Sequence, residues 1–258
     1  MLNFIDQKIR KAFSSAAMQY DILTSLHKEI GRELVEKVVM KKDSAMVLDV
    51  GMGPGWLTNR LTNVFEEAEV VGVDFSSGMI EEAKKKEGSF KIVQASAESL
   101  PFKEDIFDIV ISNLAYQWVG DLLKAFHQSY SVLKTDGVFC CTLFGRNTFE
   151  ELFLSLDSSM EDQNKTVKRL ITEKEIIRIV NEVGFKDVKI YSEEIKSHFP
   201  DMMSLVKWIK DIGANALSRD FFVGKNLLER AGQYYDQNFR DKLGIIVTFE
   251  VIWVEAKK

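Results

Sequence analysis

The sequence is poor in cysteine and proline, and it carries no excess of positive charge. Its two cysteines, Cys140 and Cys141, are adjacent, which disfavours a disulfide between them and a CxxC metal site. We interpret them as packing residues in a reducing compartment. With 34 Lys and Arg against 39 Asp and Glu, the net charge of −5 disfavours a general nucleic-acid-binding protein. Only 3 prolines and 46% apolar residues indicate an ordinary globular chain, not a disordered one.

Long hydrophobic runs are also missing. Charged residues such as Asp6, Lys8 and Arg10 interrupt the apolar N-terminal segment, so we expect no signal peptide. The longest charge-free stretch, 109–120, is shorter than the roughly 18–20 residues that cross a membrane. We therefore expect a cytoplasmic protein with neither membrane nor nucleic-acid partners, folded as a single domain over residues 1–258.

Short runs rich in β-branched residues alternate with helical patterns over the first 145 residues. This alternation predicts an α/β fold, in which a parallel sheet has helices on both faces. Two further strands are expected near the end of the chain. The expected strands cover residues 46–50, 69–74, 90–94, 107–112, 137–144, 187–192 and 245–254.

Two helical segments lie outside this alternation. Residues 1–40 place apolar side chains at helical spacing before the first strand. The last two expected strands are separated by a long interruption, in which 202–212 has an apolar helical face. Because so long a connection is usually functional, we predict a helical lid over 200–244 and a covering role for 1–40.

The most informative local pattern is a glycine-rich loop that follows the first strand. Residues 47–56 read VLDVGMGPGW, which gives G-x-G-x-G where a dinucleotide loop has G-x-G-x-x-G. Pro54 removes a backbone donor, and no lysine follows, so the loop is poorly suited to phosphate. Asp74 ends the second strand, where a carboxylate can accept both hydrogen bonds of a ribose diol. Together these features predict a nucleoside site.

These segments resemble known motifs. Residues 48–55 (LDVGMGPG), 73–79 (VDFSSGM) and 98–102 (ESLPF) are similar to successive motifs of class I S-adenosylmethionine-dependent methyltransferases. The resemblance implies a Rossmann-like, seven-stranded sheet, mostly parallel with an antiparallel C-terminal strand. It also implies S-adenosylmethionine as the methyl donor and S-adenosylhomocysteine as the product.

The donor contacts follow from the same resemblance. Asp49 would lie near the methionine amino group, Asp74 would bind the ribose, and Phe75 and Met79 would enclose the adenine. Ser96 stands where many relatives have an aspartate that binds the adenine amino group. The complete expected set is Asp49, Gly51, Gly53, Asp74, Phe75, Met79, Ser96, Ala97, Asn113 and His27.

Four other segments resemble the malonyl-acyl-carrier-protein O-methyltransferases, and extend the similarity over nearly the whole chain. They are residues 13–21 (FSSAAMQYD), 112–118 (SNLAYQW), 142–152 (TLFGRNTFEEL) and 209–215 (IKDIGAN). The resemblance implies an acyl-carrier protein bearing a malonyl group, or malonyl-coenzyme A, as the partner. The malonyl carboxylate would become a methyl ester that primes pimeloyl synthesis for biotin.

A carboxylate is ionised at neutral pH, so this reaction requires no general base. Orientation and exclusion of water should supply the rate, and orientation can contribute about 7–11 kcal/mol. We expect Tyr20 and Arg146 to be catalytic, with the Arg146 guanidinium holding the carboxylate. The acceptor and its acidic carrier should contact Gln117, Trp118, Lys207 and Lys210. We expect no metal.

Two other functions remain open. One is a methyltransferase for a small free carboxylic acid, which would need no basic lid. The other is a protein with the S-adenosylmethionine fold that assists assembly without catalysis. A dehydrogenase is disfavoured, because the dinucleotide loop lacks its third glycine.

Overall fold

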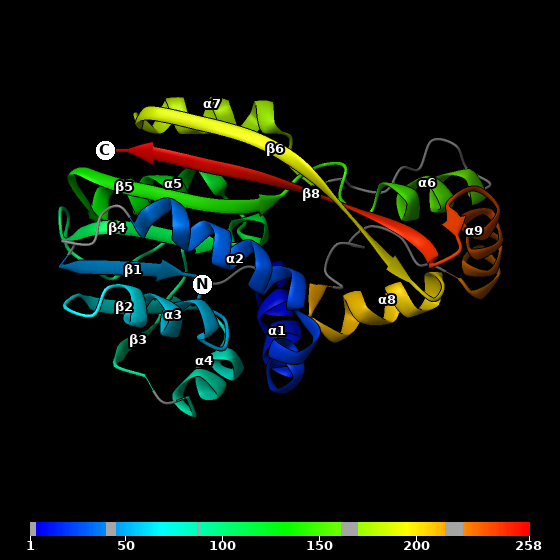
Figure 1. Ribbon diagram of the computed structural model, residues 1–258, viewed down its shortest axis with the longest axis horizontal. Coiled ribbons are helices and arrows are strands. Elements are labelled where there is room, and N and C mark those ends of the chain that lie inside the picture. Colours follow the sequence, from blue (N-terminus) through cyan, green and yellow to red (C-terminus); the bar gives the residue numbers. More distant parts are fainter. Residues whose placement is uncertain (1–3, 40–44, 87, 161–169, 215–223) are drawn as a thin grey trace.

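The computed structural model describes residues 4–39, 45–86, 88–160, 170–214 and 224–258. One sheet with the strand order β3-β2-β1-β4-β5-β8-β6 forms its centre (Figure 1). The strands are β1 (Met46–Val50), β2 (Glu69–Asp74), β3 (Phe90–Gln94), β4 (Phe107–Asn113), β5 (Leu133–Phe144), β6 (Lys186–Phe199), β7 (Arg240–Asp241) and β8 (Gly244–Lys257).

Strands β1 to β5 are parallel, and β8 runs antiparallel to both β5 and β6. This confirms the predicted mostly parallel sheet with an antiparallel C-terminal strand. The two-residue β7 is an addition to the seven predicted strands, and it pairs with the start of β8. Strand β1 is almost continuously apolar because helices cover both faces of the sheet; Val47 and Leu48 are fully buried.

Helices form a layer on each face. Helices α2 (Ser25–Val38) and α3 (Trp56–Val64) belong to one buried cluster, while α5 (Leu122–Val132) and α7 (Glu173–Val183) belong to the other. Helix α7 begins with a capping box between Thr172 and Glu175 and ends at Gly184, whose φ is 97°. Helix α4 (Ser77–Lys84) packs beside β2 and β3.

The two long strands β6 and β8 extend well beyond the end of β5. Strand β8 pairs with β5 only up to Val251, opposite Phe144, but with β6 as far as Ile245, opposite Phe199. Helices α6 (Glu150–Ser159), α8 (Met202–Asp211) and α9 (Lys225–Asn238) gather at the projecting end of this β6–β8 ribbon (Figure 1).

The sequence predictions for this region were incomplete. Strand β6 continues to Phe199, seven residues past its predicted end at 192, because residues 194–199 still pair with β8 beyond the end of β5. Helix α6 was not predicted; it begins after Phe149, which has a positive φ of 61°. Of the predicted lid, 200–244, residues 215–223 lie outside the described residues, as do 1–3 and 40 of the N-terminal segment.

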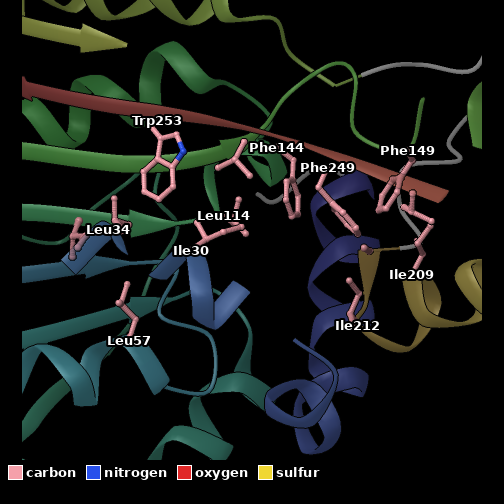
Figure 2. Close-up of a cluster of buried hydrophobic side chains, with 14 of the residues drawn as sticks. Ile30, Leu34, Leu57, Leu114, Phe144, Phe149, Ile209, Ile212, Phe249 and Trp253 are labelled. Atoms are coloured by element: carbon pink, nitrogen blue, oxygen red, sulfur yellow. The ribbon is translucent and has the colours of Figure 1, made fainter. Parts of the chain in front are cut away.

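A continuous apolar cluster joins the sheet to these projecting helices. Figure 2 shows Trp253 and Leu34 at one end, Phe149 and Ile209 at the other, and Phe144 between them. The sheet and the α6–α8–α9 region therefore share one core. Within the described part of the chain, no helix has the length and apolarity required to cross a membrane.

Candidate active site

The glycine loop has a conformation that other residues would resist. Gly51, Gly53 and Gly55 have φ values of 76°, 55° and 82°. A Cβ on Gly51 would lie 2.2 Å from the Cβ of Ala115, so the loop also has no room there. The Gly51 N–H donates to the Val73 carbonyl at 2.8 Å, which fixes the loop to the end of β2.

A cleft of about 840 Å³ opens beside this loop, at the carboxyl ends of β1, β2 and β4. Helix α1 (Phe4–Leu23) contributes Phe13 and Tyr20 to its wall. Most of the predicted donor residues line it, namely Gly51, Gly53, Asp74, Phe75, Met79, Ser96, Ala97 and Asn113. Asp49 and His27 line neighbouring cavities instead. The place of the cleft agrees with the general position of sites in open α/β sheets.

Asp74 is held rigidly at the edge of the cleft. Its Oδ2 accepts from the Gly53 N–H at 2.9 Å, and its Oδ1 accepts from the Ser76 N–H at 2.8 Å. Burial raises the pKa of Asp74 to about 6, against the opposing effect of these hydrogen bonds. Each carboxylate oxygen keeps lone-pair capacity, so the group can still accept from the two hydroxyls of a ribose.

The opposite end of the cleft is less polar. Met79 is 2% exposed, and its N–H donates to Ser76 Oγ, which caps α4. Ser96 Oγ accepts from the Glu98 N–H at 3.2 Å. Glu98 in turn accepts from the Gly120 N–H at 2.6 Å, which ties this loop to the start of α5. A flat apolar ring with a polar edge fits this end.

A second cavity, of about 400 Å³, adjoins the cleft. We call it the aromatic chamber; the two cavities share Phe13, Tyr20 and Trp118. The chamber is lined by Phe13, Tyr20, His27, Gln117, Trp118, Phe144, Phe149, Leu170, Trp208, Ile212 and Ala214. Among these described lining residues there is no Lys, Arg, Asp or Glu. The chamber is therefore mainly aromatic.

Three side chains give the chamber its polar groups. Burial raises the pKa of Tyr20, with help from the charges of Asp74 and Asp21, so its hydroxyl stays protonated. Burial lowers the pKa of His27 to about 4, which leaves a neutral imidazole at physiological pH. Gln117 Nε2 donates to the Leu114 carbonyl at 2.8 Å, whereas its buried Oε1 has no hydrogen-bond partner among the described residues.

Asn113 lines the cleft, but its side chain is already engaged. Its Nδ2 donates to the His27 carbonyl at 2.8 Å, and its Oδ1 accepts from Thr142 Oγ1 at 2.9 Å. These bonds hold the start of α2 against the end of the sheet. The geometry indicates that Asn113 positions His27, in addition to forming part of the wall.

The structure places three of the predicted acceptor residues outside the cavities. Arg146 is exposed, although Phe144 and Phe149 on either side of it in the chain line the chamber. Hydrogen bonds from Thr172 lower the pKa of Glu175 on α7, and the charge of Arg146 adds to this effect. Lys207 and Lys210 are exposed on α8, and Lys207 forms an ion pair with Asp211. Tyr20, Gln117 and Trp118 do come together in the chamber.

The sequence predicts a lid over 200–244 but does not assign Trp208 of α8 to the site. Trp208 lines the chamber, and its Nε1 donates to the Leu23 carbonyl at 2.8 Å, which ties α8 to the end of α1. Phe144 and Phe149 lie within the motif at 142–152, but the motif alone does not assign them to the site. Their only sequence signal is that they flank the carboxyl end of a strand. In the described part of the chain, no cluster of His, Cys, Asp or Glu could hold a metal ion.

The comparisons with known proteins agree with this geometry. A family model described as "Methyltransferase domain" matches residues 48–141. The malonyl-acyl-carrier-protein O-methyltransferase of Hahella chejuensis is 31% identical, over 95% of this chain and 88% of that protein. The mitochondrial arginine-hydroxylase NDUFAF5 of Mus musculus is 29% identical, over 97% of this chain and 76% of that protein. The YcgJ protein of Bacillus subtilis shares the fold, with a TM-score of 0.59 at 19% identity, over 88% of this chain and 98% of that one.

The residues of the cleft suit S-adenosylmethionine. The Asp74 carboxylate in the cleft can accept from a ribose. In the adjoining cavity, Asp49 Oδ1 is buried without a hydrogen-bond partner among the described residues and can accept from an ammonium group. Site and full-length similarity therefore lead to the same conclusion: the chain belongs to the malonyl-acyl-carrier-protein O-methyltransferase family of class I S-adenosylmethionine-dependent methyltransferases.

Proposed function

We propose that this enzyme transfers the methyl group of S-adenosylmethionine to the free carboxylate of a malonyl thioester on acyl-carrier protein. One structural observation carries the proposal: the donor cleft opens into an aromatic chamber whose described lining contains no strong base. The full-length similarity to proteins named for this reaction supports it. The product would be a malonyl methyl ester, as biotin synthesis requires.

The chemistry suits such a chamber. S-adenosylmethionine supplies a methyl group on a sulfonium, which a carboxylate oxygen can attack without losing a proton. The protein therefore has to orient the carboxylate and remove its water, and orientation alone can contribute about 7–11 kcal/mol. The neutral His27 and the aromatic walls create a dry environment, and α1 and α8 cover it.

Tyr20 and Arg146 are the proposed catalytic residues. Tyr20 lines both cavities, and its protonated hydroxyl can donate to a carboxylate at their junction. A buried carboxylate also needs a positive partner, and the described chamber lining offers none. Arg146 lies between two lining residues in the chain and has a long side chain, so we assign it that role when the acceptor binds.

The central experiment measures transfer of a labelled methyl group to malonyl-acyl-carrier protein, malonyl-coenzyme A and free small diacids in parallel. Base-labile label on the malonyl thioesters, absent from acetyl-acyl-carrier protein, is the expected result. Label on free diacids alone would replace the proposal with the small-acid alternative. Binding of S-adenosylhomocysteine without any transfer would overturn it, and would direct attention to the arginine hydroxylation named for the mouse relative.

Recognition of the carrier is proposed for the outer face of α8, where Lys207 and Lys210 are exposed. The double reversal Lys207→Glu and Lys210→Glu should raise KM about tenfold for malonyl-acyl-carrier protein, because each exposed ion pair contributes up to about 1 kcal/mol. The KM for malonyl-coenzyme A should stay unchanged. Equal effects on both substrates would exclude docking through this face.

A further inference from the structure

The turn between β5 and α6, residues 145–149, carries Arg146 and leads to Phe149 in the wall of the aromatic chamber. The backbone of this turn is bonded to β8. The Gly145 N–H donates to the Glu250 carbonyl at 2.8 Å, and the Phe149 N–H donates to the carbonyl two residues earlier in β8, also at 2.8 Å. The turn therefore continues the pairing with β8 after β5 has ended.

The side chain of Glu250 makes a further contact with the turn. Its Oε2 accepts from the Asn147 N–H at 2.7 Å, which belongs to the peptide that follows Arg146. Thr148 Oγ1 donates to the Glu250 carbonyl at 3.1 Å and accepts from the Glu250 N–H at 3.0 Å. Glu250 thus binds the turn through its backbone and its carboxylate, and the carboxylate orients the peptide between Arg146 and Asn147.

The Glu250 carboxylate fits closely against the turn. The residue is 9% exposed, and burial of a carboxylate is costly, so its hydrogen bond to Asn147 offsets part of that cost. A Cβ on Gly145 would lie 2.5 Å from both Cδ and Oε2 of Glu250. A side chain at position 145 would therefore displace the carboxylate from the Asn147 N–H.

A second buried carboxylate fixes the other end of the turn. Glu151, in the first turn of α6, is 7% exposed; it accepts from the Thr248 N–H at 2.9 Å and from the Thr248 hydroxyl. The turn is thus held to β8 at residues 248 and 250, whereas the side chain of Arg146 between these attachments is exposed. The backbone of Arg146 has a fixed position, from which its guanidinium extends.

We propose that Glu250 is a positioning residue for the acceptor: by holding the Asn147 N–H, it directs the Arg146 guanidinium toward the carboxylate that is methylated. This role rests on the proposed function, in which Arg146 binds that carboxylate. Glu250 does not line the donor cleft, the aromatic chamber or the cavity beside Asp49, so it acts through the turn. A peptide that is already oriented reduces the entropy that Arg146 loses when the acceptor binds.

Steady-state kinetics with two substitutions at this position test the role. Glu250→Gln keeps a side-chain oxygen that can accept from Asn147, so KM for the malonyl thioester should rise less than about threefold. Glu250→Ala removes that oxygen and should raise KM about 5- to 10-fold, while affinity for S-adenosylhomocysteine stays constant. Glu255→Ala is the matched control, because it removes a carboxylate from the same strand but outside all three cavities. Its KM should be that of the wild type.

A double-mutant cycle decides whether Glu250 acts through Arg146. Added to Arg146→Gln, Glu250→Ala should cause no further rise in KM. Effects that multiply would overturn the proposal, as would equal KM values for Glu250→Gln and Glu250→Ala or weaker binding of S-adenosylhomocysteine. Gly145→Ala displaces the carboxylate without removing it, so it should reproduce the KM of Glu250→Ala. It takes the place of that variant in the cycle should Glu250→Ala not fold.

The same measurements separate this role from the proposed function. A wild type that methylates only free diacids would contradict the malonyl thioester as acceptor, but the cycle run on the diacid still tests Glu250, because that acceptor also has a carboxylate. Arg146→Gln without any effect on KM would overturn the roles of both Arg146 and Glu250, and would leave methyl transfer to the malonyl thioester standing.

Discussion

The donor cleft and the aromatic chamber, which we propose holds the acceptor, are built in different ways, although they share Phe13, Tyr20 and Trp118. The cleft depends on the backbone at the ends of two strands. The Gly51–Gly55 loop follows β1, and Asp74 ends β2. The chamber is assembled from side chains of α1, α2, the segment after β5 and α8. The cleft contains the carboxylates of Asp74 and Glu98, whereas the described lining of the chamber contains no Lys, Arg, Asp or Glu and is mainly aromatic.

This difference explains how one protein can keep its donor and adapt its acceptor. A cleft made by backbone positions tolerates few substitutions, because a Cβ or a shifted N–H alters the site itself. A chamber made by side chains from separate helices can change one wall at a time. Variants that change the donor cleft and leave the chamber intact, or the reverse, therefore test this difference directly.

The largest effect is expected from Gly51→Ala. The new Cβ would lie 2.2 Å from Ala115 Cβ at a residue whose φ is 76°, so the loop must move. We expect affinity for S-adenosylhomocysteine, measured by calorimetry, to fall at least about 100-fold. Gly232→Ala on α9 is the control, because its nearest contact would be Met202 Cε at 3.8 Å. Unchanged donor binding in Gly51→Ala would show that the cleft is more adaptable than we infer.

A smaller effect, confined to binding of the acceptor, is expected from Arg146→Gln. Loss of the proposed guanidinium–carboxylate pair should raise KM for malonyl thioesters about 10- to 30-fold in steady-state kinetics, while donor affinity stays constant. Arg178→Gln provides the matched control, because Arg178 is also exposed and also influences Glu175. If the two variants behave alike, Arg146 has no special role with the acceptor.

The smallest effect concerns pH. Burial raises the pKa of Asp49 to about 7, so only above that pH is the carboxylate fully ionised and able to attract the donor's ammonium. Affinity for S-adenosylhomocysteine should therefore rise, by up to about tenfold, between about pH 6 and about pH 8. Asp49→Asn should abolish the rise.

The contributions of two other buried titratable groups must be separated from that of Asp49. The pKa of His27 is lowered to about 4, so this side chain stays neutral throughout. The pKa of Asp74 is about 6, and it faces the ribose end of the cleft. A titration with 5′-methylthioadenosine, which reaches Asp74 without an ammonium, measures that contribution. A rise as steep as that for S-adenosylhomocysteine would assign the effect to Asp74.

The same division governs what the sequence predicted. Strands β1, β2 and β3 have the predicted bounds. Strands β1 and β2 are buried apolar runs that end at the glycine loop and at Asp74, whereas β3 is a partly exposed edge strand. Most of the predicted donor residues line the cleft for the same reason. Trp208 and Phe149 could not be assigned to the chamber from their own neighbourhoods. Their role exists only after the β6–β8 ribbon brings α8 opposite α1.

The length of that ribbon has a consequence for acceptor size. Beyond Val251, β8 leaves β5 and continues with β6, carrying α6, α8 and α9 at its far end. Because strand side chains alternate, adding two residues to each strand would keep the same faces inward and move the far end by roughly 7 Å. The length of the β6–β8 ribbon would therefore set the depth of the chamber. Relatives with a longer or shorter ribbon would have a deeper or shallower chamber beside an unchanged donor cleft.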